Sequence, residues 1–311
     1  MTPFQGKLRI RHLEIALSVA DLGNLSKAAI QLGMTQSGLS RAIVDMEECV
    51  GGKLFDRTSK GMQPTALGMT LCSHAHRLLS EYHKAETDLA AVSRGELGSI
   101  SIGCFSLFSG WPFSAAIHKF RQNHPRIMIS VHTGPHEKLM EELNSGSIDV
   151  LLSRSVPGMN PEIYRTTPLL TDSVALVCSP DHPLANSTMP LLEDCVKFPW
   201  ISAMPESRIR LELEHNLRRK GIPVPSTIGA LSIEIGRELI YLDKYLWLLP
   251  ESIAATYQAR GEVLQLPVSL GLTTSPMATI WRRDKSNTRH IRDFSTCIAQ
   301  VIASKKTDLQ D

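Results

Sequence analysis

Short hydrogen-bonding side chains and one arginine stand at the start of segment 35–47, and their types and spacing are the best suited in this chain to a chemical task. They are Thr35, Gln36, Ser37, Ser40 and Arg41. Thr is a preferred helix N-cap, and Leu39, Ile43 and Met46 recur at helical spacing. A helix with its apolar stripe buried can present such polar side chains to base edges in the DNA major groove. An ordinary amphipathic surface helix fits equally well, so the flanking residues must decide.

Two helices joined by a tight turn are predicted around the start of this segment. Apolar spacing predicts helices over 8–22 and 25–32, and Gly23 ends the first of them. With segment 35–47 this makes a helix–turn–helix, in which the second helix of the motif reads bases. We also predict DNA contacts for two polar residues at the start of the preceding helix, Ser26 and Lys27.

A basic hairpin is predicted directly after the reading helix. Two extended pieces flank 59–61, and a hairpin beside such a helix is a wing that can reach phosphates or the minor groove. Arg57 and Lys60 are its predicted DNA-binding residues, and Lys53 is expected on the same side. Residues 7–65 hold eight Lys and Arg against six Asp and Glu. With so small an excess, one copy should bind DNA weakly and act as one of a pair.

A long helix with a heptad pattern is predicted over 65–94, and the seven apolar residues of that pattern extend over three repeats. They are Leu71, Ala75, Leu78, Tyr82, Ala85, Leu89 and Val92. A seam on a connecting helix favours a partner helix, so we interpret it as a dimerisation helix; packing against its own domain is the alternative.

Strands and helices alternate along 95–311, which is typical of an α/β fold with crossover connections. The chain has 311 residues, 42% of them hydrophobic and 21% charged, with a net charge of +2. No run approaches the roughly 20 apolar residues of a membrane span, so we expect a cytoplasmic protein without a membrane partner. The motifs G-x-S-x-G, P-loop and H-E-x-x-H are absent, so no enzyme is predicted.

The first 95 residues resemble the N-terminal region of LysR-type transcriptional regulators. The resemblance rests on a long, ordered string: Ala28-Ala29, Leu32, Gln36-Ser37-x-Leu39-Ser40-Arg41-x-Ile43, Met46-Glu47, Leu54-Phe55-x-Arg57-Thr58, Gly61 and Thr65-x-x-Gly68. The chain departs from the family pattern at Gly38, Lys60 and Gln63-Pro64. Within the family, it looks most like the subgroup that regulates sugar uptake or protocatechuate catabolism.

The resemblance implies an all-α winged helix–turn–helix domain over 8–64 and a linker helix over 65–94. It implies a two-lobed effector domain over 95–311, of the periplasmic-binding-protein-like α/β type. Lobe 1 would take about 98–168 and 270–311 and lobe 2 about 169–269, with crossings near 166–172 and 266–272 and a strand over 169–178. Implied partners are double-stranded DNA, a small-molecule effector, RNA polymerase and further copies in a homodimer that assembles into a tetramer.

The effector is expected between the lobes, outside the carboxyl ends of strands. The predicted effector-binding residues are Ser106, Leu107, Thr133, Gly134, Arg154, Ser202, Ala203, Met204 and Ser232. Arg154 follows a strand and can pair with a carboxylate. Trp111, Trp200 and Trp247 can stack on a sugar ring, so a sugar and an aromatic or other organic acid both stay open.

A redox-sensing regulator on the same scaffold is the alternative function. The chain has six cysteines, and the fold could bring two of them together, for example Cys178 and Cys195. None lies in a C-x-x-C pair or near histidines at zinc spacing, so free thiols, no metal and no cofactor are expected.

Overall fold

The computed structural model describes residues 8–59, 61–93, 97–155, 158–230, 232–284 and 288–308. They form two compact units, an N-terminal one that extends through the long helix α4 and a C-terminal one that holds most of the strands. No helix in the described ranges is both long and apolar enough to span a membrane. The domain limits 8–64, 65–94 and 95–311 stay a prediction.

The N-terminal unit consists of helices and one hairpin. Its elements are α1 (Ile10–Leu22), α2 (Leu25–Gln31), α3 (Gln36–Val50), β1 (Phe55–Thr58), β2 (Gly61–Pro64) and α4 (Ala66–Ser93). Gly23 ends α1 in the left-handed conformation, and the Asn24 side chain caps α2 by accepting from the N–H of Lys27. Leu13, Ala28 and Leu39 bring the first three helices into one buried cluster. The predicted winged helix–turn–helix is therefore confirmed.

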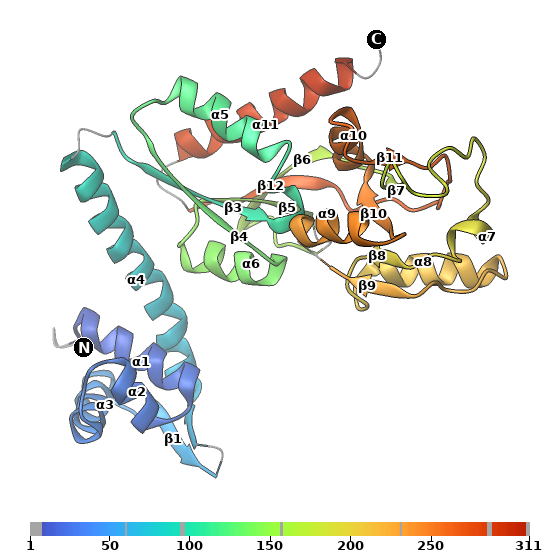
Figure 1. Cartoon of the computed structure of the whole chain (residues 1–311). Coiled ribbons are helices and arrows are strands. Elements are labelled where there is room, and N and C mark those ends of the chain that lie inside the picture. The colour runs from blue at the N-terminus through green and yellow to red at the C-terminus, as the bar shows by residue number, and fades with distance from the viewer. Residues whose placement is uncertain are drawn as a thin grey trace. The chain divides into compact units, whose positions relative to one another are not determined.

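The first lobe of the C-terminal unit is built on a five-stranded sheet in the order β4-β3-β5-β12-β6. Its strands are β3 (Ser99–Phe105), β4 (Met128–Gly134), β5 (Val150–Arg154), β6 (Tyr164–Leu170) and β12 (Met277–Arg282). The helix α5 (Phe113–Asn123) lies beside the C-terminal helix α11 (Thr288–Asp308) over one face, and α6 (His136–Ser145) covers the other (Figure 1). A 3₁₀ turn, η1 (Ser106–Phe108), follows β3.

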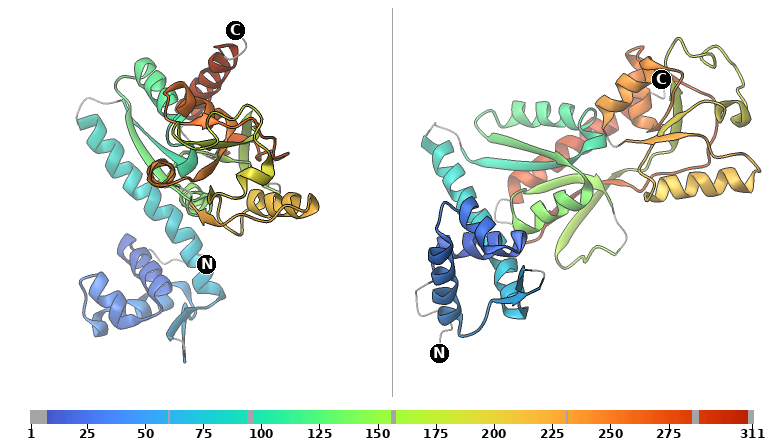
Figure 2. Two further views of the ribbon diagram at one scale, coloured as in Figure 1. Left: turned by 45° about the vertical axis from the view of Figure 1, so that its right-hand side comes forward. Right: turned by 60° about the horizontal axis from the view of Figure 1, so that its bottom comes forward.

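The second lobe has its own five-stranded sheet, in the order β11-β7-β10-β8-β9. Its strands are β7 (Val174–Cys178), β8 (Trp200–Ser202), β9 (Thr227–Gly229), β10 (Leu246–Pro250) and β11 (Leu264–Gln265). Its helices are α7 (Leu192–Cys195), α8 (Arg208–Arg219), α9 (Ile233–Leu242) and α10 (Glu251–Ala259). The right view of Figure 2 shows the two sheets side by side in separate lobes, with the gold helix α8 beside the second sheet. The predicted two-lobed α/β class is confirmed.

The first crossing between the lobes lies later than predicted. The sequence indicated one strand over 169–178, but 164–170 form the edge strand β6 of the first sheet, and only β7 belongs to the second. An edge strand needs no continuous apolar run and tolerates Pro168, so its hydrophobic pattern is weak. Asp172 and Thr274 join the two crossing segments, because the backbone N–H of Thr274 donates to the Asp172 carbonyl at 2.8 Å.

Candidate DNA-binding and effector sites

The start of α3 is ordered by its own polar side chains. The Thr35 hydroxyl accepts a hydrogen bond from the backbone N–H of Gly38 at 3.1 Å, as an N-cap residue should. The Ser26 hydroxyl donates to the Gln36 side-chain oxygen at 3.1 Å, which joins the starts of α2 and α3. A Cβ at Gly38 would meet only the Thr35 hydroxyl oxygen within 4 Å, at 3.1 Å. Apart from its own helix and the cap, no other part of the domain therefore crowds Gly38.

Buried apolar residues fix the face that α3 presents. Leu39, Ile43 and Met46 are at most 6% exposed and lie in the N-terminal core. Ser37 and Arg41 lie on the opposite side of α3 and are exposed. The other predicted DNA-binding side chains of α2 and α3 are also exposed, except that Ser40 is half-buried: Ser26, Lys27, Thr35, Gln36 and Ser40. Ser37 and Arg41, one helical turn apart, are neighbours on this surface.

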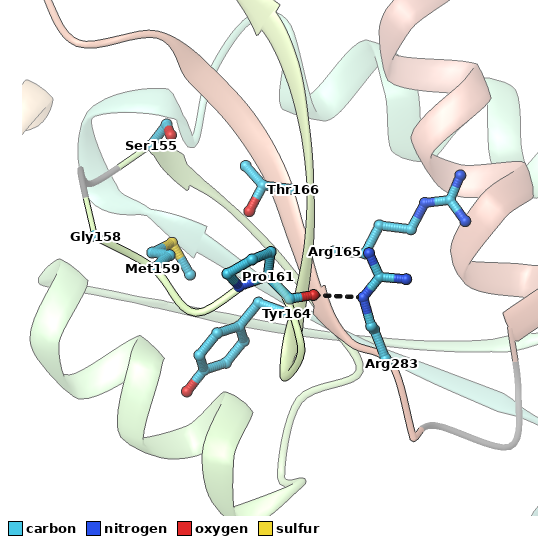
Figure 3. A pocket seen from close by; sticks show the side chains of 8 residues that line it. All are labelled: Ser155, Gly158, Met159, Pro161, Tyr164, Arg165, Thr166 and Arg283. Atoms are coloured by element: carbon cyan, nitrogen blue, oxygen red, sulfur yellow. Dashed lines mark hydrogen bonds between the residues drawn. The ribbon is translucent and has the colours of Figure 1, made fainter.

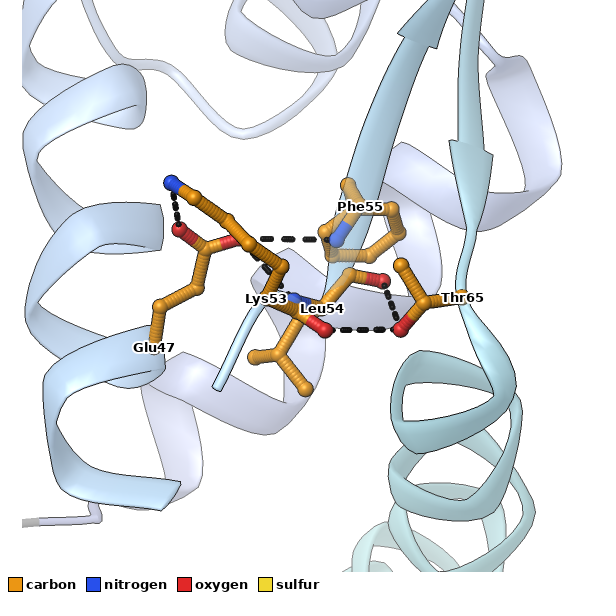
Figure 4. Close-up of polar contacts among 5 residues, drawn as sticks. All are labelled: Glu47, Lys53, Leu54, Phe55 and Thr65. Carbon is orange, nitrogen blue, oxygen red and sulfur yellow. Dashed lines mark hydrogen bonds and ion pairs between the residues drawn. The ribbon is translucent and has the colours of Figure 1, made fainter. Parts of the chain in front are cut away.

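The wing is held against the reading helix by a buried carboxylate (Figure 4). Glu47 of α3 is only 8% exposed, and its Oε1 accepts from the backbone N–H of Leu54 at 2.9 Å and of Phe55 at 3.4 Å. Its Oε2 pairs with the Lys53 ammonium at 2.7 Å. Burial opposes ionisation of Glu47, but these hydrogen bonds outweigh it, so its pKa is lowered. Lys53, expected on the DNA side, is itself 74% exposed and pairs with Glu47 from the surface of the domain.

Thr65 connects the same cluster to the long helix. Its hydroxyl donates to the Lys53 carbonyl at 2.7 Å and accepts from the N–H of Gly68 at 3.1 Å. A Cβ at Gly68 would lie 2.0 Å from the Leu54 carbonyl oxygen, so only glycine fits there. We call Glu47, Lys53, Leu54, Phe55 and Thr65 the Glu47 cluster; it links the reading helix, the wing and α4.

The wing itself is a short antiparallel hairpin. Arg57 pairs with Met62 in its register and is exposed. The N–H of Met62 donates to the Gly23 carbonyl at 2.8 Å, which fixes the hairpin against the turn after α1. Lys60, the other predicted wing residue, lies outside the described residues.

The heptad pattern of α4 divides into two parts. Leu71 and Ala75 are buried in the N-terminal core. The remaining five residues are exposed, and we call them the exposed seam: Leu78, Tyr82, Ala85, Leu89 and Val92. Packing within the domain therefore accounts for the first two residues and leaves the rest uncovered in the single chain.

A cavity of about 210 Å³ lies between the two lobes of the C-terminal unit. Three of the predicted effector-binding residues line it: Leu107, Arg154 and Ala203. The other lining residues were not in the predicted set; they include Phe105, Val174, Ser207, Arg208, Leu248 and Ser275. The start of α8 was not predicted to line the cavity, because the sequence of one lobe does not indicate which helix of the other lobe faces its strands.

Six predicted effector-binding residues do not line this cavity. Ser232 caps α9 by accepting from the N–H of Ile235 at 3.4 Å. Thr133 is exposed at the end of β4, and Met204 is 40% exposed. Ser202 lies next to the lining residue Ala203; it is 2% exposed, and its hydroxyl has no hydrogen-bond partner among the described residues. Ser106 and Gly134 are the other two predicted residues that do not line the cavity.

Arg154 is the more buried of the two arginines that line the cavity. Its guanidinium donates to the Ser275 carbonyl at 3.0 Å and lies over the Phe108 ring, 5.1 Å from the centroid. Burial and repulsion from Arg208 lower the pKa of Arg154 to about 10, against an opposing attraction from Asp172. It therefore stays cationic at neutral pH while its mobility is restricted.

A second hollow, of about 560 Å³, follows the edge strand β6 but lacks a convergent set of groups. Figure 3 shows the Arg165 guanidinium pointing away from Ser155 and Met159. Arg165 lies over the Trp281 ring, and Arg283 donates its Nε–H to the Pro161 carbonyl at 2.6 Å. These arginines support the local fold, so we do not place the effector here.

The tryptophans and cysteines give little support to a sugar or a redox signal. Trp200 and Trp247 are at most 3% exposed, and Trp200 donates its Nε1–H to the Cys195 carbonyl, so both belong to the core. Cys178 and Cys195 share one buried cluster as free thiols. Burial raises the pKa of both thiols to about 11. A buried, protonated thiol reacts poorly with oxidants.

A winged helix–turn–helix followed by a two-lobed unit with a cavity between its lobes defines a DNA-binding protein that senses a small molecule. Residues 93–303 match the family model described as LysR substrate binding domain. Residues 10–69 match the model described as Bacterial regulatory helix-turn-helix protein, lysR family. The chain belongs to the LysR family of transcriptional regulators, which are not enzymes.

Individual relatives agree with this assignment. The chain is 25% identical over 308 residues to the HTH-type transcriptional regulator GbpR of Azospirillum brasilense, a match that covers 98% of this chain and 89% of GbpR. The crystal structure of CbnR, a LysR family transcriptional regulator, superposes with a TM-score of 0.65 at 18% identity, covering 95% of this chain and 99% of CbnR. The crystal structure of full-length CbnR complexed with its target DNA superposes with a TM-score of 0.65 at 19% identity. This match covers 94% of this chain and 100% of the CbnR chain.

Proposed function

We propose that α3 reads base edges through its N-terminal side chains while the wing contacts the sugar–phosphate backbone. The observation that carries this proposal is the buried stripe Leu39, Ile43 and Met46, which leaves Ser37 and Arg41 exposed on the opposite side of the helix. Arg is well suited to guanine in the major groove, and Arg57 on the wing suits a phosphate. Ser26, Lys27, Thr35, Gln36, Ser40 and Lys60 complete the proposed DNA-binding set.

We propose that the exposed seam of α4 pairs two copies, and that two such dimers assemble into a tetramer. Symmetric DNA readers gain affinity by contacting two half-sites, and the small local charge excess makes a single copy a weak binder. A cytoplasmic regulator of this kind would also contact RNA polymerase at the promoter.

The proposed effector is a small molecule, a sugar or an aromatic or other organic acid, held between the lobes. A ligand shifts a conformational equilibrium only by its difference in affinity for the two states. Residues from both lobes and from the crossing segment line the same cavity, so a molecule there can favour one lobe arrangement. The unpartnered Ser202 hydroxyl, next to a lining residue, is a candidate for hydrogen bonding to it.

Binding measurements with operator and scrambled DNA test the base-reading role. The Arg41→Ala variant should lose specific binding by about 1–3 kcal/mol and nonspecific binding by much less. Arg57→Ala, and likewise Lys60→Ala, should weaken both DNAs similarly and reduce the salt dependence by about one charge. Equal losses on the two DNAs for Arg41→Ala would refute its base-reading role.

A further inference from the structure

The cavity between the lobes carries two arginines. Arg154 enters from the end of β5 in the first lobe, and Arg208 from the first turn of α8 in the second. The charge of Arg208 is close enough to lower the pKa of Arg154, in addition to the effect of burial. Two cations that face the same space repel each other until an anion lies between them.

Neither arginine is neutralised inside the cavity by the groups it contacts. Arg154 contacts a backbone carbonyl and an aromatic ring, neither of which carries a net charge. Arg208 donates to the Thr273 carbonyl at 3.2 Å and lies 3.7 Å from Glu212, a residue of its own helix that does not line the cavity. The nearby acid Asp172 is engaged by Ser252, whose hydroxyl and backbone N–H both donate to its carboxylate.

The backbone adds positive potential on the Arg208 side. The helix α8 is twelve residues long, and its N-cap Ser207 and first residues Arg208 and Ile209 line the cavity. Helix N-termini favour anions because their first N–H groups and the helix dipole point at the ligand. The dipole of α8 and the Arg208 side chain therefore both favour an anion on this side of the cavity.

The remaining lining is largely apolar. Phe105, Leu107, Val174, Leu248 and Leu249 contribute to it. A cavity of about 210 Å³ suits a small molecule and not an oligosaccharide. A sugar would leave these apolar walls facing hydroxyl groups and would offer the two guanidinium groups no carboxylate to bind.

We propose that the effector is a small carboxylic acid with an apolar or aromatic body, whose carboxylate binds between Arg154 and Arg208. This inference rests on the proposed function, because it names the ligand class of the same cavity. Since Arg154 also holds Ser275 in the crossing segment, a carboxylate at Arg154 acts directly on the chain between the lobes.

Matched ligands test the charge requirement. Thermal shift and isothermal titration of the full-length protein would compare benzoate with benzamide, protocatechuate with its amide, and succinate with succinamide, and would include glucose and galactose. At least one acid should bind at least tenfold more tightly than its neutral amide.

The arginine variants test the proposed contacts. Arg154→Gln should reduce binding of that acid at least tenfold. Arg208→Gln should reduce it less, because Arg208 is more exposed. Arg219→Gln, at the far end of α8, serves as the matched control and should change binding less than twofold.

Three outcomes overturn the proposal: a sugar that binds when the acids do not, amides that bind as well as acids, or no acid binding at millimolar concentration. A DNA-binding measurement on the natural protein and on the Arg219→Gln control, both without ligand, separates a failure of this proposal from a failure of the proposed function. Both proteins should bind operator DNA more tightly than scrambled DNA. If the natural protein itself shows no preference for operator DNA, the proposed function fails whatever the ligand result.

Discussion

The carboxylate of Glu47 accepts a hydrogen bond from the backbone N–H of Leu54 at 2.9 Å. This bond joins the second half of the reading helix to the residue that precedes the wing. An acidic residue so deeply buried is stable only when it is paired and hydrogen-bonded, and Lys53 and Phe55 complete its partners. The angle between the reading helix and the wing is thus set by one side chain that need not touch DNA.

Replacing Glu47 by Gln should destabilise the N-terminal domain by about 2 kcal/mol, because hydrogen bonds to a charged group lose strength with the charge. It should also weaken operator binding, since the wing loses its fixed position. Urea unfolding and a DNA-binding titration measure the two effects. Glu48→Gln, on the exposed neighbour, is the matched control. If both variants behave alike, Glu47 does not position the wing.

The contribution of Glu47 should depend on pH. The folded-state pKa of Glu47 lies below its ordinary value of 4.5, so its ionised form stabilises the fold fully above that value. The stabilisation is lost as the pH falls through the lowered pKa. The difference in unfolding free energy between natural protein and Glu47→Gln should be constant from pH 8 to pH 5 and shrink below 4.5. A difference that grows on acidification would contradict this assignment.

A methyl group at Gly68 should be poorly tolerated. Its Cβ would lie 2.0 Å from the Leu54 carbonyl oxygen and 3.1 Å from the carbonyl carbon, and backbone atoms cannot turn aside. Despite the better helix propensity of alanine, Gly68→Ala should destabilise the domain by about 1–3 kcal/mol. Thermal unfolding measures this, with Ser73→Ala on the exposed face of α4 as control. An unchanged midpoint would show that α4 can move away from Leu54.

Local rules were sufficient for the reading helix. Thr35 caps α3 and the stripe Leu39, Ile43 and Met46 is buried, because a cap and a periodic face depend on residues a few positions apart. The structural role of Glu47 was not predicted. An acidic residue next to the apolar stripe gives the same sequence pattern whether its carboxylate faces solvent or accepts hydrogen bonds from a loop.

Long-range partners were harder to predict from the sequence. Arg154 was found because it directly follows a strand, whereas Arg208 faces it only through packing of two lobes whose contacts are distant in sequence. The edge strand β6 was missed for a different reason, because its mostly half-buried side chains give no clear apolar period.

The two parts of the α4 heptad pattern should respond differently to substitution. Leu71 is 9% exposed and packs in the N-terminal core, so Leu71→Ala should destabilise the fold by about 2–4 kcal/mol. Leu78 and Leu89 are 53% and 70% exposed, so replacing both by Gln should leave the fold of a single chain intact. If the exposed seam forms the dimer, light scattering should show this double variant shifting to a smaller species while circular dichroism is unchanged. Its operator affinity should fall with the loss of the second half-site. A double variant of unchanged mass would place the dimer contact elsewhere in the molecule.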